Sequence, residues 1–153
     1  MDKRRFHHST TITVRNYEID WQGVVHNAVY LHYFDVGRIE YLNHVGATVD
    51  INTINHASKV VLARNEIDYL KPARFGEVLR VHSRVALISN TSFVFEGILE
   101  VDDSKETVAE NRGVIVWLDE RTGKPARVPE HFRKLVGAHE GTDCVIQDPT
   151  ITV

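Results

Sequence analysis

Apolar and polar residues alternate along several stretches of the chain, with the two-residue period of a β-strand that buries one face. The clearest stretch spans residues 78–88, whose two faces carry Leu79, Val81, Ser83, Val85 and Leu87 on one side and Arg80, His82, Arg84 and Ala86 on the other. The same reasoning predicts strands over residues 10–19, 59–70, 92–101 and 107–118. Polar turns join the last three strands, which is typical of an antiparallel meander.

Residues 28–45 follow the period of an α-helix instead. Apolar residues recur there at steps of three and four, namely Tyr30, Phe34, Gly37, Tyr41 and Val45, with Leu31 and Leu42 widening the stripe. Asn27 is the predicted N-cap and Gly46 the predicted C′ residue. Because the apolar stripe is broad, we expect protein to surround most of this helix. One long helix with an antiparallel sheet indicates an α+β fold.

Three further segments are short or weakly patterned. Residues 47–57 are polar and are predicted to form a loop or a short helical excursion near the mouth of a site. Residues 125–136 are predicted to hold a short helix, and the chain after Gly137 has no clear period. We therefore expect one domain over residues 1–138 and a poorly ordered C-terminal tail over residues 139–153.

The composition is that of an ordinary globular protein, with 153 residues, 42% hydrophobic and 25% charged. The net charge of −3 weighs against a nucleic-acid-binding surface, which is usually basic. A single cysteine, Cys144, allows no intramolecular disulfide. The sequence shows neither a secretory signal nor an apolar run of membrane-spanning length, so a cytoplasmic location is expected.

Nine histidines raise the question of a metal site. No two of them have the HxxxH or HExxH spacing, and a single cysteine cannot form a thiolate pair. No phosphate-binding loop and no serine nucleophile elbow are found either. The sequence therefore predicts no bound metal.

The strongest candidate for chemistry is the carboxylate of Asp20, which precedes the predicted helix start at Asn27. A turn at Gly23 can fold this segment back toward the first helical turn. N–H groups at a helix N-terminus lack intrahelical acceptors, so they can bind a carbonyl oxygen as it becomes an oxyanion. Asp20 is then placed to attack the carbonyl carbon or to deprotonate a water molecule. On spacing alone, an Asp that merely caps a helix is the more common case.

Two motifs resemble those of hot-dog-fold acyl-CoA thioesterases, and more narrowly the 4-hydroxybenzoyl-CoA thioesterase-like branch. The first is DWQGVVHNAVYL, which spans residues 20–31 and is followed by Tyr33, Phe34 and Arg38. The second is Ile67-Asp68-Tyr69 followed by Pro72, Arg74 and Gly76, which is similar to the end of the family's second strand. Together with the strand pattern, the resemblance covers about residues 8–136.

The resemblance implies a hot-dog fold, in which a five-stranded antiparallel sheet curls around the long helix. It also implies a homodimer, often with continuous sheets and with active sites at the subunit interface, or a homotetramer built as a dimer of dimers. Asp20 matches the catalytic carboxylate, and Asn27 matches the residue whose backbone amide polarises the thioester carbonyl. Many relatives carry His at position 27 and Asn at position 29, so only the backbone role of Asn27 is implied.

Other residues of the first motif are candidate substrate contacts. Gly23, His26 and Tyr30 are predicted to lie against the substrate. A partly exposed loop histidine and a core tyrosine are the simpler interpretations of His26 and Tyr30. Arg38 is expected to form a structural ion pair before any catalytic role.

Charged residues elsewhere supply further candidates. Glu66 is a reserve carboxylate, because some hot-dog thioesterases take the acid from this strand or from the central helix. Lys71, Arg74 and Arg84 are candidate contacts for nucleotide phosphates. Solvated surface charge is the simpler role for each of these cations.

The predicted function is thioester hydrolysis, in which an acyl-CoA or acyl-carrier substrate yields a carboxylic acid and a free thiol. No cofactor is expected apart from the coenzyme A of the substrate. A hot-dog hydratase or dehydratase is one alternative, and a non-hydrolytic acyl-CoA-binding protein is another. The aromatic side chains of Trp21, Tyr30 and Phe34 suit an aryl group or a medium acyl chain equally.

Overall fold

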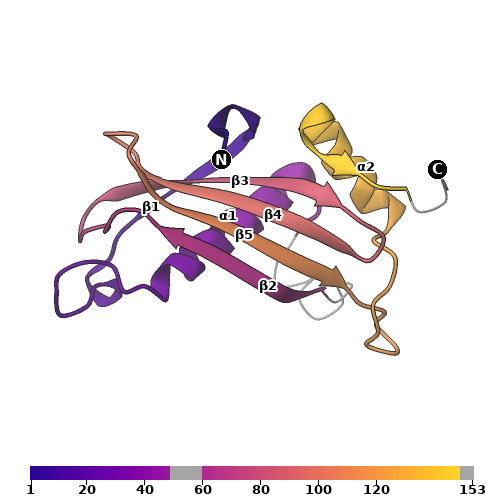
Figure 1. The fold of residues 1–153 in the computed structure, drawn as a ribbon, viewed down its shortest axis with the longest axis horizontal. Helices are drawn as coiled ribbons and strands as arrows, with labels where there is room; N and C mark the ends of the chain where they lie inside the picture. Colours follow the sequence, from indigo (N-terminus) through magenta and orange to yellow (C-terminus); the bar gives the residue numbers. More distant parts are fainter. Residues whose placement is uncertain (49–59, 149–153) are drawn as a thin grey trace.

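The computed structural model describes residues 1–48 and 60–148, and one long helix wrapped by a curved antiparallel sheet lies at its centre (Figure 1). The helix is α1 (Val29–Val45), and a shorter helix α2 (Glu130–Glu140) follows the sheet. The sheet order is β1-β3-β4-β5-β2, with β1 (His8–Thr13), β2 (Val60–Tyr69), β3 (Val78–Ile88), β4 (Ser92–Val101) and β5 (Thr107–Trp117). A short strand, β6 (Val145–Ile146), pairs in parallel with β3. The predicted α+β arrangement of five antiparallel strands around a helix is confirmed.

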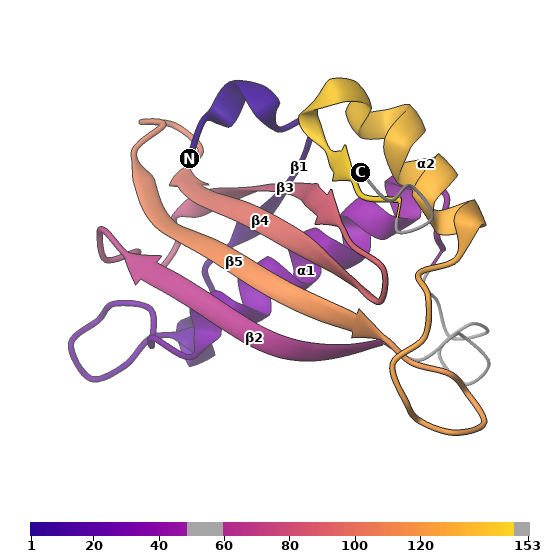
Figure 2. The ribbon, with the colours of Figure 1, turned by 45° about the vertical axis from the view of Figure 1, so that its right-hand side comes forward.

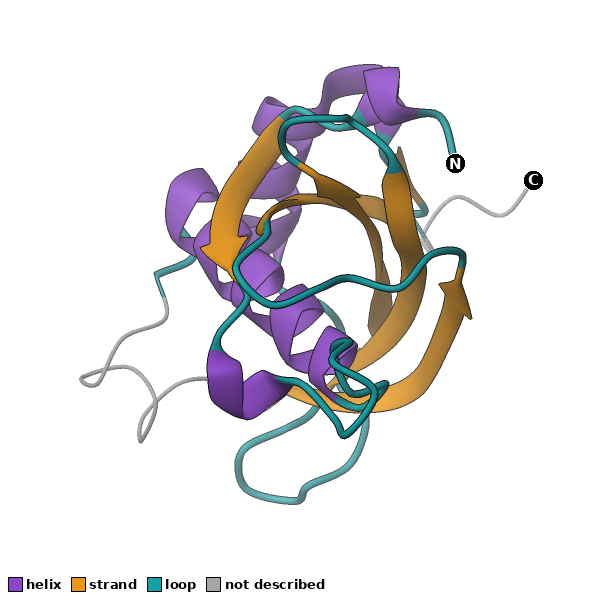
Figure 3. Ribbon diagram, turned by 90° about the vertical axis from the view of Figure 1, so that its left-hand side faces the viewer, coloured by secondary structure: helices purple, strands orange, loops and turns teal. Residues whose placement is uncertain are grey.

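Two glycines allow α1 to lie directly on the inner face of the sheet, which curves around it (Figure 3). A Cβ atom at Gly37 would lie 2.5 Å from Val81 Cγ1 and 2.6 Å from Ser83 Oγ. A Cβ atom at Gly97 would lie 2.6 Å from the Phe34 ring. These distances are shorter than van der Waals contact, so a larger residue at either position would push the helix away from the sheet.

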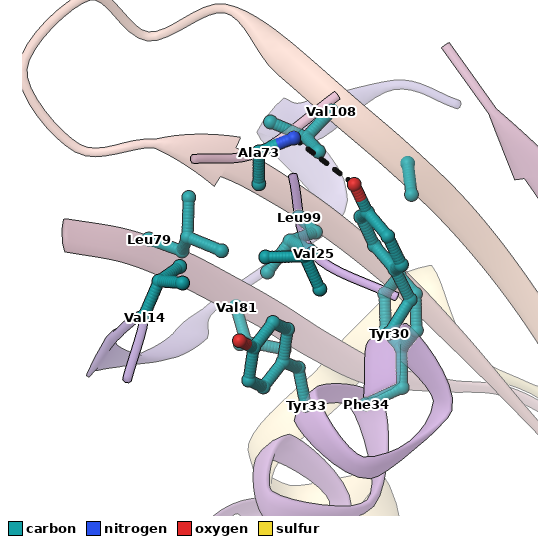
Figure 4. Packing of buried hydrophobic residues seen from close by; sticks show 11 residues of the cluster. Val14, Val25, Tyr30, Tyr33, Phe34, Ala73, Leu79, Val81, Leu99 and Val108 are labelled. Atoms are coloured by element: carbon teal, nitrogen blue, oxygen red, sulfur yellow. Dashed lines mark hydrogen bonds between the residues drawn. The ribbon is translucent and has the colours of Figure 1, made fainter. Parts of the chain in front are cut away.

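Two groups of buried apolar side chains fill the space between α1 and the sheet. The first surrounds the N-terminal half of α1 and is shown in Figure 4; it comprises Val14, Val25, Tyr30, Tyr33, Phe34, Ala73, Leu79, Val81, Leu99, Val108 and Ala109. The second surrounds the C-terminal half and includes residues of α2; it comprises Tyr41, Val85, Ile88, Phe93, Phe95, Ile115, Val128, Phe132, Val136 and Cys144. Val36 and Ile39 lie exposed on the opposite side of α1. Protein therefore covers less of the helix than the broad stripe predicts.

The two ends of α1 differ in how well the sequence predicts them. The helix begins at Val29, with Ala28 rather than Asn27 at the N-cap position and no side-chain cap. At the other end Gly46 adopts a left-handed φ of 93°, and the Ala47 N–H donates to the Leu42 carbonyl at 2.9 Å. This is the predicted glycine C-cap, which closes the last turn.

The strand predicted over residues 10–19 is found only in its first part. β1 ends at Thr13, and a 3₁₀ turn over Asn16–Glu18 follows. The Glu18 carboxylate accepts hydrogen bonds from the Arg15 N–H at 2.8 Å and from the Arg15 guanidinium at 3.1 and 3.0 Å. These bonds close the turn and bury Glu18, and an alternating pattern alone does not reveal them.

β3 contains a bulge that changes which face its last residues occupy. Val85 pairs with Phe95, but Leu87 pairs with Val94, so Ala86 is an additional residue on this strand. Beyond the bulge Ile88, rather than Leu87, enters the core. The prediction that Leu87 lies on the same face of the strand as Leu79, Val81 and Val85 is therefore wrong, because an inserted residue inverts the alternation.

The segment after Gly137, expected to be an irregular tail, forms secondary structure as far as Ile146. α2 continues to Glu140, and a 3₁₀ turn (Gly141–Asp143) leads into β6. The Gln147 N–H donates to the Ile88 carbonyl at 2.9 Å, so the segment extends the sheet beside β3. In Figure 2 this yellow segment and α2 lie beside the C-terminal end of α1. The helix predicted over residues 125–136 begins later, at Glu130, because Pro129 occupies the N-cap position, and it ends later, at Glu140.

β2 forms an open edge of the sheet. It pairs only with β5 within the described ranges, and nine of its ten residues are exposed.

Most of the loop predicted over residues 47–57 lies outside the described residues. None of the described helices is both long enough and apolar enough to cross a membrane.

Candidate active site

Asp20 lies in a tight loop that precedes α1. The segment leading into α1 is the purple loop at the lower left of Figure 2. The Asp20 N–H donates to the Val24 carbonyl at 2.9 Å, and the Gly23 N–H donates to the Asp20 carbonyl at 3.0 Å. Gly23 has a φ of +77°, a conformation that glycine adopts without strain. The Gln22 N–H donates to Asp20 Oδ1 at 2.7 Å. One carboxylate oxygen is thus fixed by the loop, and Oδ2 has no hydrogen-bond partner in the described parts of the chain.

Backbone hydrogen bonds join this loop to the rest of the fold. Ile19 and Val25 form an antiparallel bridge, and the Val25 N–H donates to the Ala73 carbonyl at 2.8 Å. The His26 N–H donates to the Glu18 carbonyl at 3.0 Å. Burial alone would raise the pKa of Glu18, but the hydrogen bonds and charge of Arg15 lower it, so this anchoring carboxylate is ionised.

The residues just before α1 form the N-terminal tip of the helix. The Ala28 N–H donates to His26 Nδ1 and to Asn27 Oδ1, both at 3.1 Å. The Tyr69 hydroxyl donates to the Asn27 carbonyl oxygen at 2.9 Å. The Asn27 N–H finds no acceptor within residues 1–48 and 60–148. An open N–H at the positive end of a helix is suited to bind a developing negative charge.

The Asp20 loop, the helix tip and the end of β2 enclose a cleft of about 600 Å³. Its lining residues are Asp20, Trp21, Gln22, Val24, Val25, His26, Asn27, Tyr30, Tyr69, Leu70, Lys71 and Pro72. The Trp21 side chain is 90% exposed, and Tyr69 and Leu70 are also exposed. The cleft therefore combines one carboxylate and one open amide with apolar walls, which is the usual composition of a small-molecule site.

Comparison with known proteins decides the family. The family model of the thioesterase-like superfamily matches residues 14–136, which include the Asp20 loop, α1 and all of the cleft. The chain belongs to the thioesterase-like superfamily.

Individual relatives agree with this assignment. This superfamily member is 34% identical over 131 residues to acyl-acyl carrier protein thioesterase ATL2, chloroplastic, of Arabidopsis thaliana, and the match covers 85% of the chain and 68% of ATL2. It spans 65% of the Arabidopsis thaliana relative ATL3. It is 25% identical over 125 residues to the long-chain acyl-CoA thioesterase FadM of Escherichia coli, with 82% and 93% of the two chains covered.

Solved structures agree as well. A thioesterase from Thermus thermophilus, complexed with coenzyme A and Zn, is 33% identical and superposes with a TM-score of 0.77 over 89% of this chain and 96% of that one. The predicted family, the hot-dog fold and the thioesterase class are thereby confirmed.

Five of the residues predicted from the sequence of this superfamily member line the cleft, namely Asp20, His26, Asn27, Tyr30 and Lys71. Lys71 Nζ lies 2.5 Å from Glu106 Oε2, so its charge is already paired at the cleft margin. The Tyr30 hydroxyl accepts a 3.0 Å hydrogen bond from the Ala73 N–H (Figure 4). Burial raises the pKa of Tyr30. Tyr30 is therefore both a core residue and a wall of the cleft.

Two predicted contacts lie next to the cleft rather than in its lining. Gly23 forms the turn that shapes the Asp20 loop, and its contribution is conformational. Arg74 is exposed, and its backbone forms a bridge with Val24. The Arg74 guanidinium has no hydrogen-bond or ion-pair partner in the described parts of the chain.

Two predicted residues lie away from the cleft. Glu66 forms an ion pair with Arg64, two residues away on the same face of β2, whereas Asn65 on the opposite face contacts Arg38 of α1. The Arg84 side chain is buried and donates to Glu96 Oε2 at 2.9 Å and to the Asp143 carbonyl at 2.6 Å. Neither residue lines the cleft, because each points to the face of the sheet opposite α1.

Tyr69 also lines the cleft, and the sequence pattern does not predict a role for it. The motif Ile67-Asp68-Tyr69 marks the end of β2, but the pattern does not say which element that end reaches. The contact with Asn27 joins positions 42 residues apart. Only the sheet order, which places β2 at the edge beside the helix tip, brings the two together.

Proposed function

We propose that the protein hydrolyses acyl thioesters of coenzyme A or of an acyl carrier protein, releasing a carboxylic acid and a free thiol. In this proposal Asp20 acts as nucleophile or general base, and the Asn27 N–H binds the oxyanion. One observation carries the proposal: Asp20 and Asn27 line the same cleft at the N-terminus of α1, and among the described residues Asp20 Oδ2 has no hydrogen-bond partner and the Asn27 N–H has no acceptor.

Either role of Asp20 gives a balanced reaction. As nucleophile, Asp20 forms a bond to the thioester carbon, the C–S bond breaks with its electron pair leaving on sulfur, and water then hydrolyses the mixed anhydride. As general base, Asp20 removes a proton from a water molecule while the water oxygen bonds to that carbon; the C–S bond then breaks with its electron pair leaving on sulfur, and the thiolate takes up the proton held by Asp20. In both routes negative charge develops on the carbonyl oxygen. One oxyanion donor is typically worth about 3 kcal/mol of transition-state stabilisation.

The class of substrate follows from the relatives and from the cleft. The plant relative is named for acyl carrier protein thioesters, and the Thermus thermophilus structure holds coenzyme A. Both carriers present the acyl group at the end of a thiol-terminated arm, so the same cleft suits either. Trp21, Tyr69 and Leu70 supply apolar walls for the acyl group.

A homodimer joined along β2 is part of this proposal. An edge strand with unpaired N–H and C=O groups and exposed apolar side chains is a template for pairing with a second chain. Val60 and Val61 are each 45% exposed, and Leu62 is 47% exposed. Because Tyr69 at the end of β2 lines the cleft, such a dimer would place each site near the joint. A dimer of dimers remains the larger assembly expected from the family resemblance.

The activity test is a panel of saturated and aromatic acyl-CoA thioesters, with release of the free thiol measured by a thiol reagent. We expect hydrolysis by the wild-type protein and a loss of about 10²–10⁴-fold in Asp20→Asn. Asp103→Asn, in an exposed turn, is the matched control and keeps full activity. Full activity in Asp20→Asn would contradict the assigned role of this carboxylate.

The same panel distinguishes thioester hydrolysis from the two alternative functions. A hydratase or dehydratase leaves a saturated acyl-CoA unchanged, because it has no double bond to hydrate and no β-hydroxyl to eliminate. A binding protein retains the thioester without releasing thiol. Thiol release from hexanoyl-CoA therefore excludes both alternatives, and its absence across the panel would reject the proposed function.

A further inference from the structure

The residue that carries the open amide is held by a side chain from another element. Asn27 precedes α1, which begins at Val29, so the hydrogen bonds within the helix do not fix its backbone. The Tyr69 hydroxyl donates to the Asn27 carbonyl oxygen at 2.9 Å. Tyr69 is the last residue of β2, so this bond joins the edge of the sheet to the helix tip.

We propose that Tyr69 is a positioning residue that aims the Asn27 amide at the thioester carbonyl; this inference rests on the proposed function. The hydroxyl proton of Tyr69 is used by the Asn27 carbonyl, so it is not available to the substrate. Tyr69 thus acts on the reaction through Asn27. A backbone amide contributes most when its direction is fixed before the substrate arrives.

Tyr69 is itself firmly supported, as a positioning residue must be. Its ring packs edge-on against the Tyr30 ring, with the centroids 5.2 Å apart and an interplanar angle of 84°. Tyr30 is in turn held by the Ala73 N–H. The N–H groups of Leu70 and Lys71 both donate to the Val108 carbonyl, at 2.9 and 3.1 Å, which fixes the chain directly after Tyr69.

Tyr69→Phe isolates the hydroxyl, because the ring and its packing on Tyr30 remain. We expect kcat to fall about tenfold while KM changes less than about twofold. Complete loss of an oxyanion donor costs about 10²–10³ in kcat, and a donor that is present but poorly aimed loses part of that. Tyr17→Phe removes an equivalent hydroxyl from an exposed tyrosine outside the cleft, and it keeps wild-type kcat and KM.

A direct contact between Tyr69 and the carrier arm would behave differently. We compare hexanoyl-CoA with the hexanoyl thioester of N-acetylcysteamine, which keeps the reacting group and lacks most of the arm. Positioning predicts the same loss of kcat with both substrates. A loss expressed as a higher KM, and only with hexanoyl-CoA, would overturn the inference in favour of substrate binding.

The mobility of the Asn27 amide in the free protein tests the positioning role without depending on catalytic activity. We expect the ¹⁵N order parameter of the Asn27 amide to decrease in Tyr69→Phe and to stay unchanged in Tyr17→Phe. An unchanged order parameter together with unchanged kcat would overturn the positioning role. Absence of thiol release by the wild-type protein would instead reject the proposed function, so the two failures are distinguishable.

Discussion

The Tyr41 hydroxyl of α1 donates a 2.6 Å hydrogen bond to Glu140 Oε1 of α2, across 99 residues of sequence. The same oxygen accepts the Val85 N–H of β3 at 3.1 Å. All three residues are buried. A single carboxylate therefore joins the central helix, the sheet and the C-terminal helix.

Tyr41→Phe is expected to lower the free energy of unfolding by about 1–3 kcal/mol, because the buried Glu140 carboxylate loses one of the two donors that the described residues supply to it. The ring contact with Phe95 is kept, so packing changes little. Urea denaturation followed by circular dichroism measures the effect. Tyr17→Phe, at an exposed tyrosine, is the control, and equal stability of the two variants would contradict the prediction.

Stability should fall in mild acid because of a histidine cluster beside Tyr41. The ring centroids of His8 and His44 lie 5.0 Å apart, and those of His44 and His139 lie 5.1 Å apart. Burial, followed by the charges of His44 and His139, lowers the pKa of His8 from 6.5 to about 4. Within the described ranges, no three His, Cys, Asp or Glu side chains are arranged to hold a metal ion.

The sign of the effect follows from proton binding. A histidine whose pKa is lower in the folded state binds fewer protons there, so its contribution is complete above about pH 6.5 and is lost as the pH falls toward 4. The loss for His8 is at most about 3 kcal/mol. Urea denaturation at pH 7.5 and 4.5 measures it. His8→Phe should show a smaller difference between the two pH values, and an unchanged difference would contradict the assignment to His8.

Gly37→Ala should strongly destabilise the fold. Its Cβ would lie 2.5 Å from Val81 Cγ1, so α1 or β3 would have to move at a cost of about 1–3 kcal/mol. Gly137→Ala in α2 is the matched comparison, because its Cβ would lie 3.2 Å from Ile146 Cδ1, the flexible end of a side chain. A thermal midpoint that drops in Gly37→Ala and not in Gly137→Ala is the expected result, and the reverse order would contradict it.

Val61→Lys should convert the proposed dimer into monomers. A charge on the open β2 edge disfavours pairing with a second strand. Light scattering after size-exclusion chromatography measures the mass of the wild type and the variant. Arg121→Lys, in an exposed turn, is the control that keeps the wild-type mass. A monomeric wild type would reject the β2 joint.

Features set by local chemistry were predictable from the sequence. Gly46 ends α1 because its left-handed backbone conformation favours glycine, and polar turns separate the strands of the meander. Features set by distant contacts were not. The bulge at Ala86 inverts the strand pattern. Glu140 lies in the core, where it accepts a hydrogen bond from Tyr41, 99 residues earlier in the sequence.

The same division holds for the candidate site. Asp20 and Asn27 lie within one motif, so the sequence places them together. Glu66 was selected because some hot-dog thioesterases take the acid from this strand, and Arg84 because a cation suits nucleotide phosphates. The positions of both on the outer face of the sheet depend on strand register. Tyr69 reaches Asn27 only through the sheet order.

β2 carries the proposed subunit joint on its first residues and Tyr69 on its last. Any displacement of this strand on dissociation would therefore move Tyr69 and, through its hydrogen bond to the Asn27 carbonyl, the amide of Asn27. Specific activity is then expected to depend on protein concentration, falling on dilution below the dissociation constant of the dimer. Dimer dissociation would in this way lower kcat without a bound effector.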